Sequence, residues 1–163
     1  MYQISIIQSK RFAGEKRLLE KEPLDNMTAY QDESNPLIWY FYIKGQKDTP
    51  FNGGEYIGRI QHSPEYPAKP PKFFMLTPSG RFELEKEICL TISQHHPESW
   101  TSNWNIKTIL IAFYSIFLDD KEVGASFIKT TDSEKKTFAM GSQAYNQKHL
   151  KGIYEKFNLK NIK

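Results

Sequence analysis

Cysteine is almost absent from this sequence of 163 residues, which contains only Cys89. A single cysteine cannot form a disulfide within the chain, and this suits a reducing intracellular compartment. The sequence opens with no secretory signal pattern, so we expect a cytoplasmic protein. Most free cysteines are small, buried hydrophobic residues, so two interpretations of Cys89 stand side by side at this point: a core residue or a reactive thiol.

Long apolar runs are also missing. The longest, from Ile106 to Leu118, contains polar residues and is shorter than the roughly 20 residues of a membrane span. There is no Cys/His set with metal-ligand spacing, no glycine-rich phosphate loop and no Ser/His/Asp motif. The net charge of +3 is too small to indicate nucleic acid. We therefore expect no metal, no cofactor, no nucleic-acid partner and no membrane span in this chain.

The elements follow an order typical of an α+β domain. The sequence predicts an N-terminal helix, a four-stranded antiparallel meander, an active-site loop and then C-terminal helices. The segment from Asp25 to Pro36 is either a loop or a short edge strand. The other expected elements are a helix over 9–22, strands over 37–43, 56–61 and 72–76, and helices over 106–118 and from Thr131 to about Leu150. One domain then covers 1–163, with 1–8 as an extension and 151–163 as a C-terminal tail.

Several landmarks together resemble the ubiquitin-conjugating enzymes, over about residues 9–150. Within that family the chain is similar to the J-type branch, through the turn from Leu76 to Phe82 and the segment from His95 to Trp100. The family landmarks are Trp39, the segment 51–54, the proline-rich segment 66–72, and Ile88-Cys89-Leu90 with Trp100 eleven residues after the cysteine.

The resemblance implies an acyltransferase that needs no metal or other cofactor. An activating enzyme would pass ubiquitin to Cys89 as a thioester, and a ligase would assist its transfer to a substrate lysine, or to serine or threonine. A free thiol has a pKa of about 8.5, so it is only slightly ionised until a partner docks. A dedicated histidine base paired with Cys89 is therefore not expected.

Ser79 departs from the family pattern. It stands where the family commonly carries an asparagine that donates to the oxyanion of the transition state. The sequence leaves several accounts open: Ser79 donates, directly or through water; Asn103 or Asn105 substitutes for it; Ser79 merely holds the turn; or the enzyme is slow.

Three further residues match family positions near the acceptor. His96 matches a histidine of the J-type branch and is either a base for hydroxyl acceptors or a loop residue packed by Trp100. Asp119 and Asp120 match an acid that orients the incoming amine, or they form a solvated helix end.

The resemblance also implies two partner surfaces. The one for the activating enzyme comprises Lys10, Arg11, Lys16 and Arg17, which could equally be a solvated helix face. The one for a ligase comprises Tyr66, Pro67, Ala68, Lys69, Pro70, Trp100, Thr101 and Ser102. Ala68 and Ser102 are smaller or more polar than the anchors common in the family, which predicts a narrow set of ligases.

Two other functions stay open: a ubiquitin-conjugating-like module that binds ubiquitin or a ligase with little or no transfer, and an enzyme for another ubiquitin-like protein. J-type relatives usually end in a hydrophobic anchor at the endoplasmic reticulum, whereas this chain ends in a polar segment rich in lysine and asparagine. We expect a cytoplasmic location, or the cytosolic face of that membrane if the natural protein carries an anchor.

Overall fold

The computed structural model describes residues 3–88, 90, 99–121 and 123–157. Its four strands form one antiparallel sheet in the order β1-β2-β3-β4, which confirms the predicted α+β meander. The elements are α1 (Ile6–Lys21), β1 (Met27–Gln31), β2 (Ile38–Lys44), β3 (Glu55–Gln61), β4 (Lys72–Met75), α2 (Ile106–Leu118), α3 (Asp132–His149) and α4 (Lys151–Tyr154).

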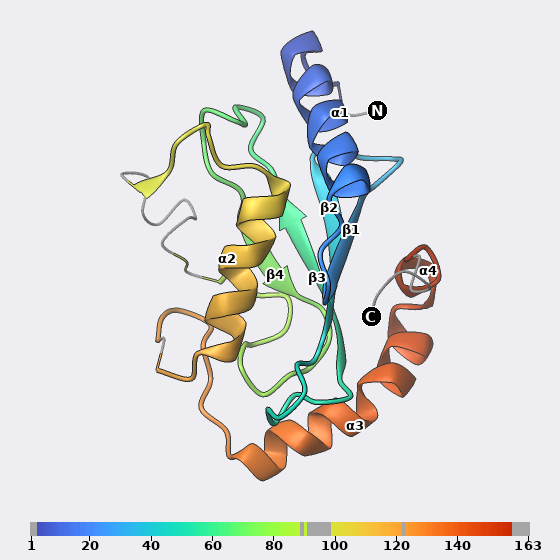
Figure 1. The fold of residues 1–163 in the computed structure, drawn as a ribbon, viewed down its shortest axis with the longest axis vertical. Helices are drawn as coiled ribbons and strands as arrows, with labels where there is room; N and C mark the ends of the chain where they lie inside the picture. Colours follow the sequence, from blue (N-terminus) through green and yellow to red (C-terminus); the bar gives the residue numbers. More distant parts are fainter. Residues whose placement is uncertain (1–2, 89, 91–98, 122, 158–163) are drawn as a thin grey trace.

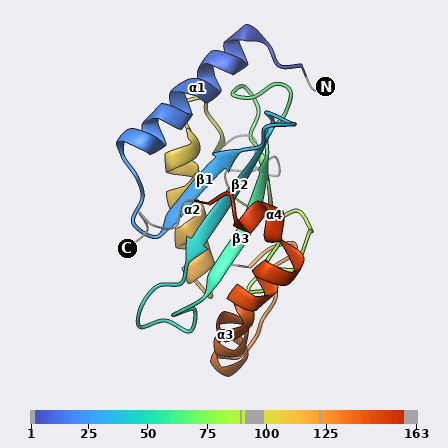
Figure 2. The same cartoon turned by 90° about the vertical axis from the view of Figure 1, so that its right-hand side faces the viewer.

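The sheet has helices on both of its faces. Figure 1 shows α2 on one side of the sheet and α3 with α4 on the other, while α1 lies across the upper end. The quarter turn of Figure 2 brings α4 in front of the strands and leaves α2 behind them. The sheet is therefore covered on both faces, and each face has its own apolar cluster.

Strand β2 divides its side chains between these clusters, because successive residues of a strand point to opposite faces. Phe41 belongs to the main cluster, where its ring lies 5.1 Å from that of Phe113 in α2. Tyr42 belongs to the second cluster, together with Tyr154 and Phe157. Gly58, opposite Phe41 in the register, is required there because a Cβ would lie 2.1 Å from the Phe41 ring.

Helix α1 begins at Ile6, three residues before the predicted start at Ser9. Ser5 is the N-cap: its hydroxyl accepts a hydrogen bond from the amide of Gln8, and the Gln8 side chain accepts one from the amide of Ser5. This capping box is a helix start signal. Part of the segment expected as an extension therefore belongs to the helix.

The predicted starts of the later helices are confirmed. Asn105 caps α2 and Thr131 caps α3, each through a capping box. Helix α2 is the most apolar helix, but no helix among the described residues has the length and apolar character needed to cross a membrane. The single-turn helix α4 and Phe157 pack on the sheet, so the first part of the expected tail is folded.

Candidate active site and partner-facing loops

The chain leading to Cys89 is held along its length by hydrogen bonds to neighbouring segments. The amides of Glu85 and Ile88 donate to the carbonyls of Met75 and Phe73 at 2.9 Å each, which ties this stretch to β4. On the other side, the Ser126 hydroxyl donates to the Glu87 carbonyl at 2.8 Å. Cys89 lies outside the described residues.

The residues on either side of the cysteine, Ile88 and Leu90, are 0% and 2% exposed. Glu85 and Lys86, within the charged run from Glu83 to Glu87, are exposed. Burial of both flanking side chains fixes the backbone on either side of Cys89, while the exposed run keeps this segment at the protein surface.

Ser79 lies in the tight turn from Thr77 to Arg81 and is 1% exposed. Its Oγ accepts a hydrogen bond from the amide of Arg81 at 3.1 Å. The next residue, Gly80, has a φ of 81°, and a Cβ there would lie 2.7 Å from the Thr130 hydroxyl, so this turn requires glycine. This hydrogen bond fits the interpretation in which Ser79 holds the turn.

Arg81 fastens the same turn to the C-terminal end of α2. Its guanidinium donates to the carbonyls of Phe117, Ile116 and Asp119 at 3.1, 2.9 and 2.6 Å. The last carbonyls of a helix lack partners within the helix and attract a cation, so this contact stabilises both segments.

Asn146 is a supporting residue that the sequence analysis missed. It is fully buried on α3; its Nδ2 donates to the Glu55 carbonyl at 2.9 Å, and its Oδ1 accepts from the Thr77 hydroxyl at 2.6 Å. That hydroxyl in turn accepts from the amide of Ile57 at 2.9 Å. The spacing was the available signal: Asn146 follows Ser142 by four residues, so the two lie on the same, inner face of α3.

Replacing Asn146 by alanine should lower the free energy of unfolding by about 2 kcal/mol, because the part-buried Glu55 carbonyl and the buried Thr77 hydroxyl would each lose a partner. Urea denaturation measures the difference. The control is Gln147→Ala at the neighbouring exposed position. Equal stability of the two variants would contradict a supporting role for Asn146.

The candidate acceptor-side residues fall in different places. Asp119 is exposed and ends α2, where its Oδ1 accepts from the amide of Lys121 at 3.0 Å, and Asp120 beside it is exposed. Asn105 uses its side chain to cap α2, which occupies the amide oxygen. Asn103 is exposed in the loop before it. His96 lies outside the described residues.

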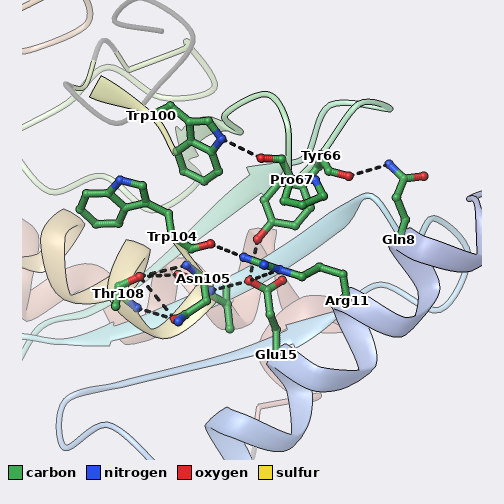
Figure 3. Close-up of polar contacts among 10 residues, drawn as sticks. Gln8, Arg11, Glu15, Tyr66, Pro67, Trp100, Trp104, Asn105 and Thr108 are labelled. Carbon is green, nitrogen blue, oxygen red and sulfur yellow. Dashed lines mark hydrogen bonds and ion pairs between the residues drawn. The ribbon is translucent and has the colours of Figure 1, made fainter. Parts of the chain in front are cut away.

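Two loops that are far apart in sequence meet at one end of the molecule. We call residues 63–71 the arm and residues 100–104 the partner loop. The Trp100 indole N–H donates to the Pro67 carbonyl at 2.9 Å, and the rings of Tyr66 and Trp100 lie 6.1 Å apart. Figure 3 shows this contact beside α1. The structure therefore joins the two segments that the sequence analysis assigned to one surface.

Within that surface, three of the assigned residues are buried. Tyr66 is 1% exposed, Trp100 is 7% exposed, and Pro70 is also buried. Tyr66 and Pro70 therefore offer little side-chain surface to a partner, and the Tyr66 ring instead stacks on that of Phe12, with the ring centres 5.3 Å apart. The exposed or half-exposed residues are Pro67, Ala68, Lys69, Thr101 and Ser102.

The basic residues of α1 also separate into two kinds. Lys10, Lys16 and Arg17 are exposed. The Arg11 side chain is only 27% exposed and lies against Glu15, with Nε 3.7 Å from the Glu15 carboxylate. A docking surface for an acidic partner would therefore use the first three residues.

Comparison with known proteins agrees with this architecture. The family model described as "Ubiquitin-conjugating enzyme" matches residues 11–145. The chain is 41% identical over 139 residues to "Ubiquitin-conjugating enzyme E2 J2-like" of Dictyostelium discoideum, covering 85% of this chain and 81% of that protein. It is 38% identical to "Ubiquitin-conjugating enzyme E2 6" of Schizosaccharomyces pombe, covering 84% and 60%, and 41% identical to human "Ubiquitin-conjugating enzyme E2 J1", covering 80% and 42%.

A solved structure shows the same fold. The structure of human ubiquitin-conjugating enzyme E2 G1 matches with a TM-score of 0.63 at 22% identity, over 72% of this chain and 99% of that one. The names of the J1 and J2-like relatives support the J-type branch. The chain belongs to the ubiquitin-conjugating enzyme family, whose members form thioester intermediates.

Proposed function

We propose that Cys89 accepts ubiquitin from an activating enzyme and transfers it to a substrate lysine with the help of a ligase. The observation that carries the proposal is the place of this cysteine in the sequence and the burial of its two neighbours. It is the one cysteine of a chain in this family; its sequence neighbours Ile88 and Leu90 are buried, and the amide of Ile88 is bonded to the carbonyl of Phe73 in β4.

The chemistry consists of two acyl transfers. In the first, the Cys89 thiolate attacks the ubiquitin thioester on the activating enzyme; a new thioester forms and the activating enzyme's thiolate leaves. In the second, a neutral amine attacks the Cys89 thioester, an amide forms, the amine loses a proton and the Cys89 thiolate leaves. A thioester is reactive enough toward amines that neither step needs a proteolytic triad.

Incubation with activating enzyme, ubiquitin and ATP tests the proposal. We expect an adduct of one ubiquitin that disappears when reductant is added. Parallel reactions with other ubiquitin-like proteins and their activating enzymes identify the modifier. If no modifier forms an adduct, the chain acts as a binding module and the proposal is wrong.

The partner surfaces follow from the exposed residues. Lys10, Lys16 and Arg17 of α1 would meet the acidic docking domain of the activating enzyme, where complementary charge raises the association rate. The exposed tips of the arm and the partner loop, which carry Ala68 and Ser102 respectively, would meet the ligase. Small and polar tips are poor affinity anchors, which favours few ligases.

For Ser79, we propose that the hydroxyl holds the turn, since it is buried and accepts from the amide of Arg81. Ser79→Ala should therefore lower the free energy of unfolding by about 1 kcal/mol. We expect discharge of the thioester onto free lysine to slow by less than about tenfold, whereas loss of an oxyanion donor slows a reaction by about a hundredfold or more. A hundredfold loss without any change in stability would instead identify Ser79 as the donor.

For His96, we propose a role as base toward hydroxyl acceptors, because the pKa of a serine or threonine hydroxyl is too high for unaided attack. His96→Asn should slow discharge onto free serine by about a hundredfold and discharge onto free lysine far less. The matched control is His95→Asn at the neighbouring position. An equal loss with both acceptors would contradict the base assignment. Asp119 and Asp120 are proposed to orient the amine acceptor.

We propose that this chemistry takes place in the cytosol, because a chain with one cysteine and no internal disulfide suits a reducing compartment. The similarity to J-type proteins extends the proposal to the cytosolic face of the endoplasmic reticulum and its degradation pathway. Fractionation of cells that express the complete natural gene product tests this extension; recovery without any membrane association would contradict it.

A further inference from the structure

Arg11 lies in a different environment from the other basic residues of α1. Its Nη2 donates to the carbonyl of Trp104, in the partner loop. Its guanidinium carbon lies 5.7 Å from the centre of the Tyr66 ring, in the arm. Figure 3 shows the guanidinium between α1 and the two loops. Arg11 therefore contacts both loops at once.

Glu15 lies one helical turn further along α1 and is 4% exposed. Its Oε1 accepts from the Tyr66 hydroxyl at 2.6 Å and from the amide of Ile106, the first residue of α2, at 2.9 Å. Burial raises the pKa of Glu15, while the hydrogen bond from Tyr66 and the charge of Arg11 oppose that rise. One carboxylate thus joins the arm to the start of α2, and Arg11 provides the nearby positive charge.

Two further hydrogen bonds complete the connection. Gln8 Nε2 donates to the carbonyls of Pro64 and Tyr66 at 2.6 and 3.1 Å, and the Trp100 indole joins the partner loop to the arm through Pro67. The arm is therefore fixed to α1, the partner loop is fixed to α1, and the loops are fixed to each other. The inner face of α1 sets the distance between their exposed tips.

We propose that Arg11 and Glu15 are the positioning pair of the ligase-facing surface, a role that rests on the proposed function. The tips offer Ala68 and Ser102, which bury little apolar area on a partner. Affinity then depends on loops that are already in place, because ordering them on binding would cost part of the interaction energy. The planar guanidinium of Arg11 spans the carbonyl of Trp104 and the Glu15 carboxylate; an ammonium in its place keeps the charge and loses this geometry.

Arg11→Lys tests the pair, and Arg59→Lys is the matched control. Arg59 is half-buried on β3, where it lies over the Phe74 ring, 4.5 Å from the ring centre. We expect exchange of the Trp100 indole proton and of the Ile106 amide, followed by NMR, to be about tenfold faster in Arg11→Lys than in Arg59→Lys. Amides of α3 report general unfolding and should exchange equally in the two variants.

A functional measurement uses a RING-type ligase domain chosen because it accelerates discharge of the wild-type thioester onto lysine. The ratio of aided to unaided discharge is measured in each variant against the concentration of this domain. In Arg11→Lys the half-saturating concentration should rise about tenfold while the limiting ratio is retained, as expected when a contact surface is loosened and the chemistry is not.

Two results would overturn the inference. One is equal exchange and equal half-saturation in the two arginine variants. The other is faster exchange throughout Arg11→Lys, including α3, which would show a general loss of stability. If wild-type protein forms no thioester with any modifier, the proposed function fails, and so does the ligase role of the pair; the exchange measurement then reports only whether the pair holds the loops.

Discussion

Cys89→Ser is expected to replace the reductant-sensitive ubiquitin adduct by a reductant-resistant one, and to slow transfer to lysine by at least about a thousandfold. The serine hydroxyl is a far weaker nucleophile than a thiolate, and the ester it forms reacts slowly with amines. The gel assay for adduct formation and the discharge rate onto free lysine measure the two effects. Because this variant contains no cysteine, transfer to lysine at the wild-type rate would show that the reaction does not pass through a thioester on this chain and would contradict the proposal.

The composition of the chain provides a direct control. Because Cys89 is the one cysteine, a reagent that alkylates thiols modifies Cys89 and no other thiol of the chain. Alkylated wild-type protein should form no adduct, and urea denaturation of the alkylated protein and of Cys89→Ser should show that both remain folded. An adduct on alkylated protein would contradict the assignment of Cys89 independently of the serine variant.

The second large effect is an expected loss of stability in mild acid through His62. This residue is 2% exposed and lies among aromatic rings, 4.1 Å from that of Tyr66 and 5.1 Å from that of Phe12. Neither ring nitrogen has a hydrogen-bond partner among the described residues. Burial, with a smaller contribution from the charge of Arg11, lowers the pKa of His62 from 6.5 to about 3.

The sign follows from which state binds the proton. Below pH 6.5 the unfolded chain protonates His62 and the folded protein does not, so the free energy of unfolding falls as the pH falls toward 3. Each pH unit costs about 1.4 kcal/mol, which gives a loss of about 2 kcal/mol between pH 7 and pH 5. The raised pKa of Glu15 acts in the opposite direction, so a variant that lacks only the imidazole must be compared with the wild type.

His62→Leu is that variant, since leucine has a similar volume and does not titrate. Urea denaturation at pH 7, 6 and 5 measures the free energy of unfolding. As the pH falls from 7 to 5, this free energy should rise by about 2 kcal/mol in the variant relative to the wild type. His149→Leu, at the exposed end of α3, controls for a leucine in place of a histidine. A constant difference between His62→Leu and the wild type at all three pH values would contradict the prediction.

Local signals determined much of the fold. The starts of α2 and α3 were predicted correctly, because the residues that cap them, Asn105 and Thr131, are close in sequence to the first amides that they pair with. Strands β2, β3 and β4 were predicted from apolar runs bounded by turn-forming residues, whereas the segment that forms β1 was left open between a loop and a short edge strand. The start of α1 was missed although Ser5 and Gln8 form the same kind of cap.

The sequence by itself also determined the family, and with it the expectation that Cys89 is the reactive thiol. What only the tertiary structure decided are the long-range contacts: the Asn146 support of the Thr77 turn, the burial of Tyr66 in the arm, and the placement of Arg11 between two loops. The partners in these contacts are more than fifty residues apart. Local propensity and periodicity carry no information on such pairs, because they form only when the helices pack on the sheet.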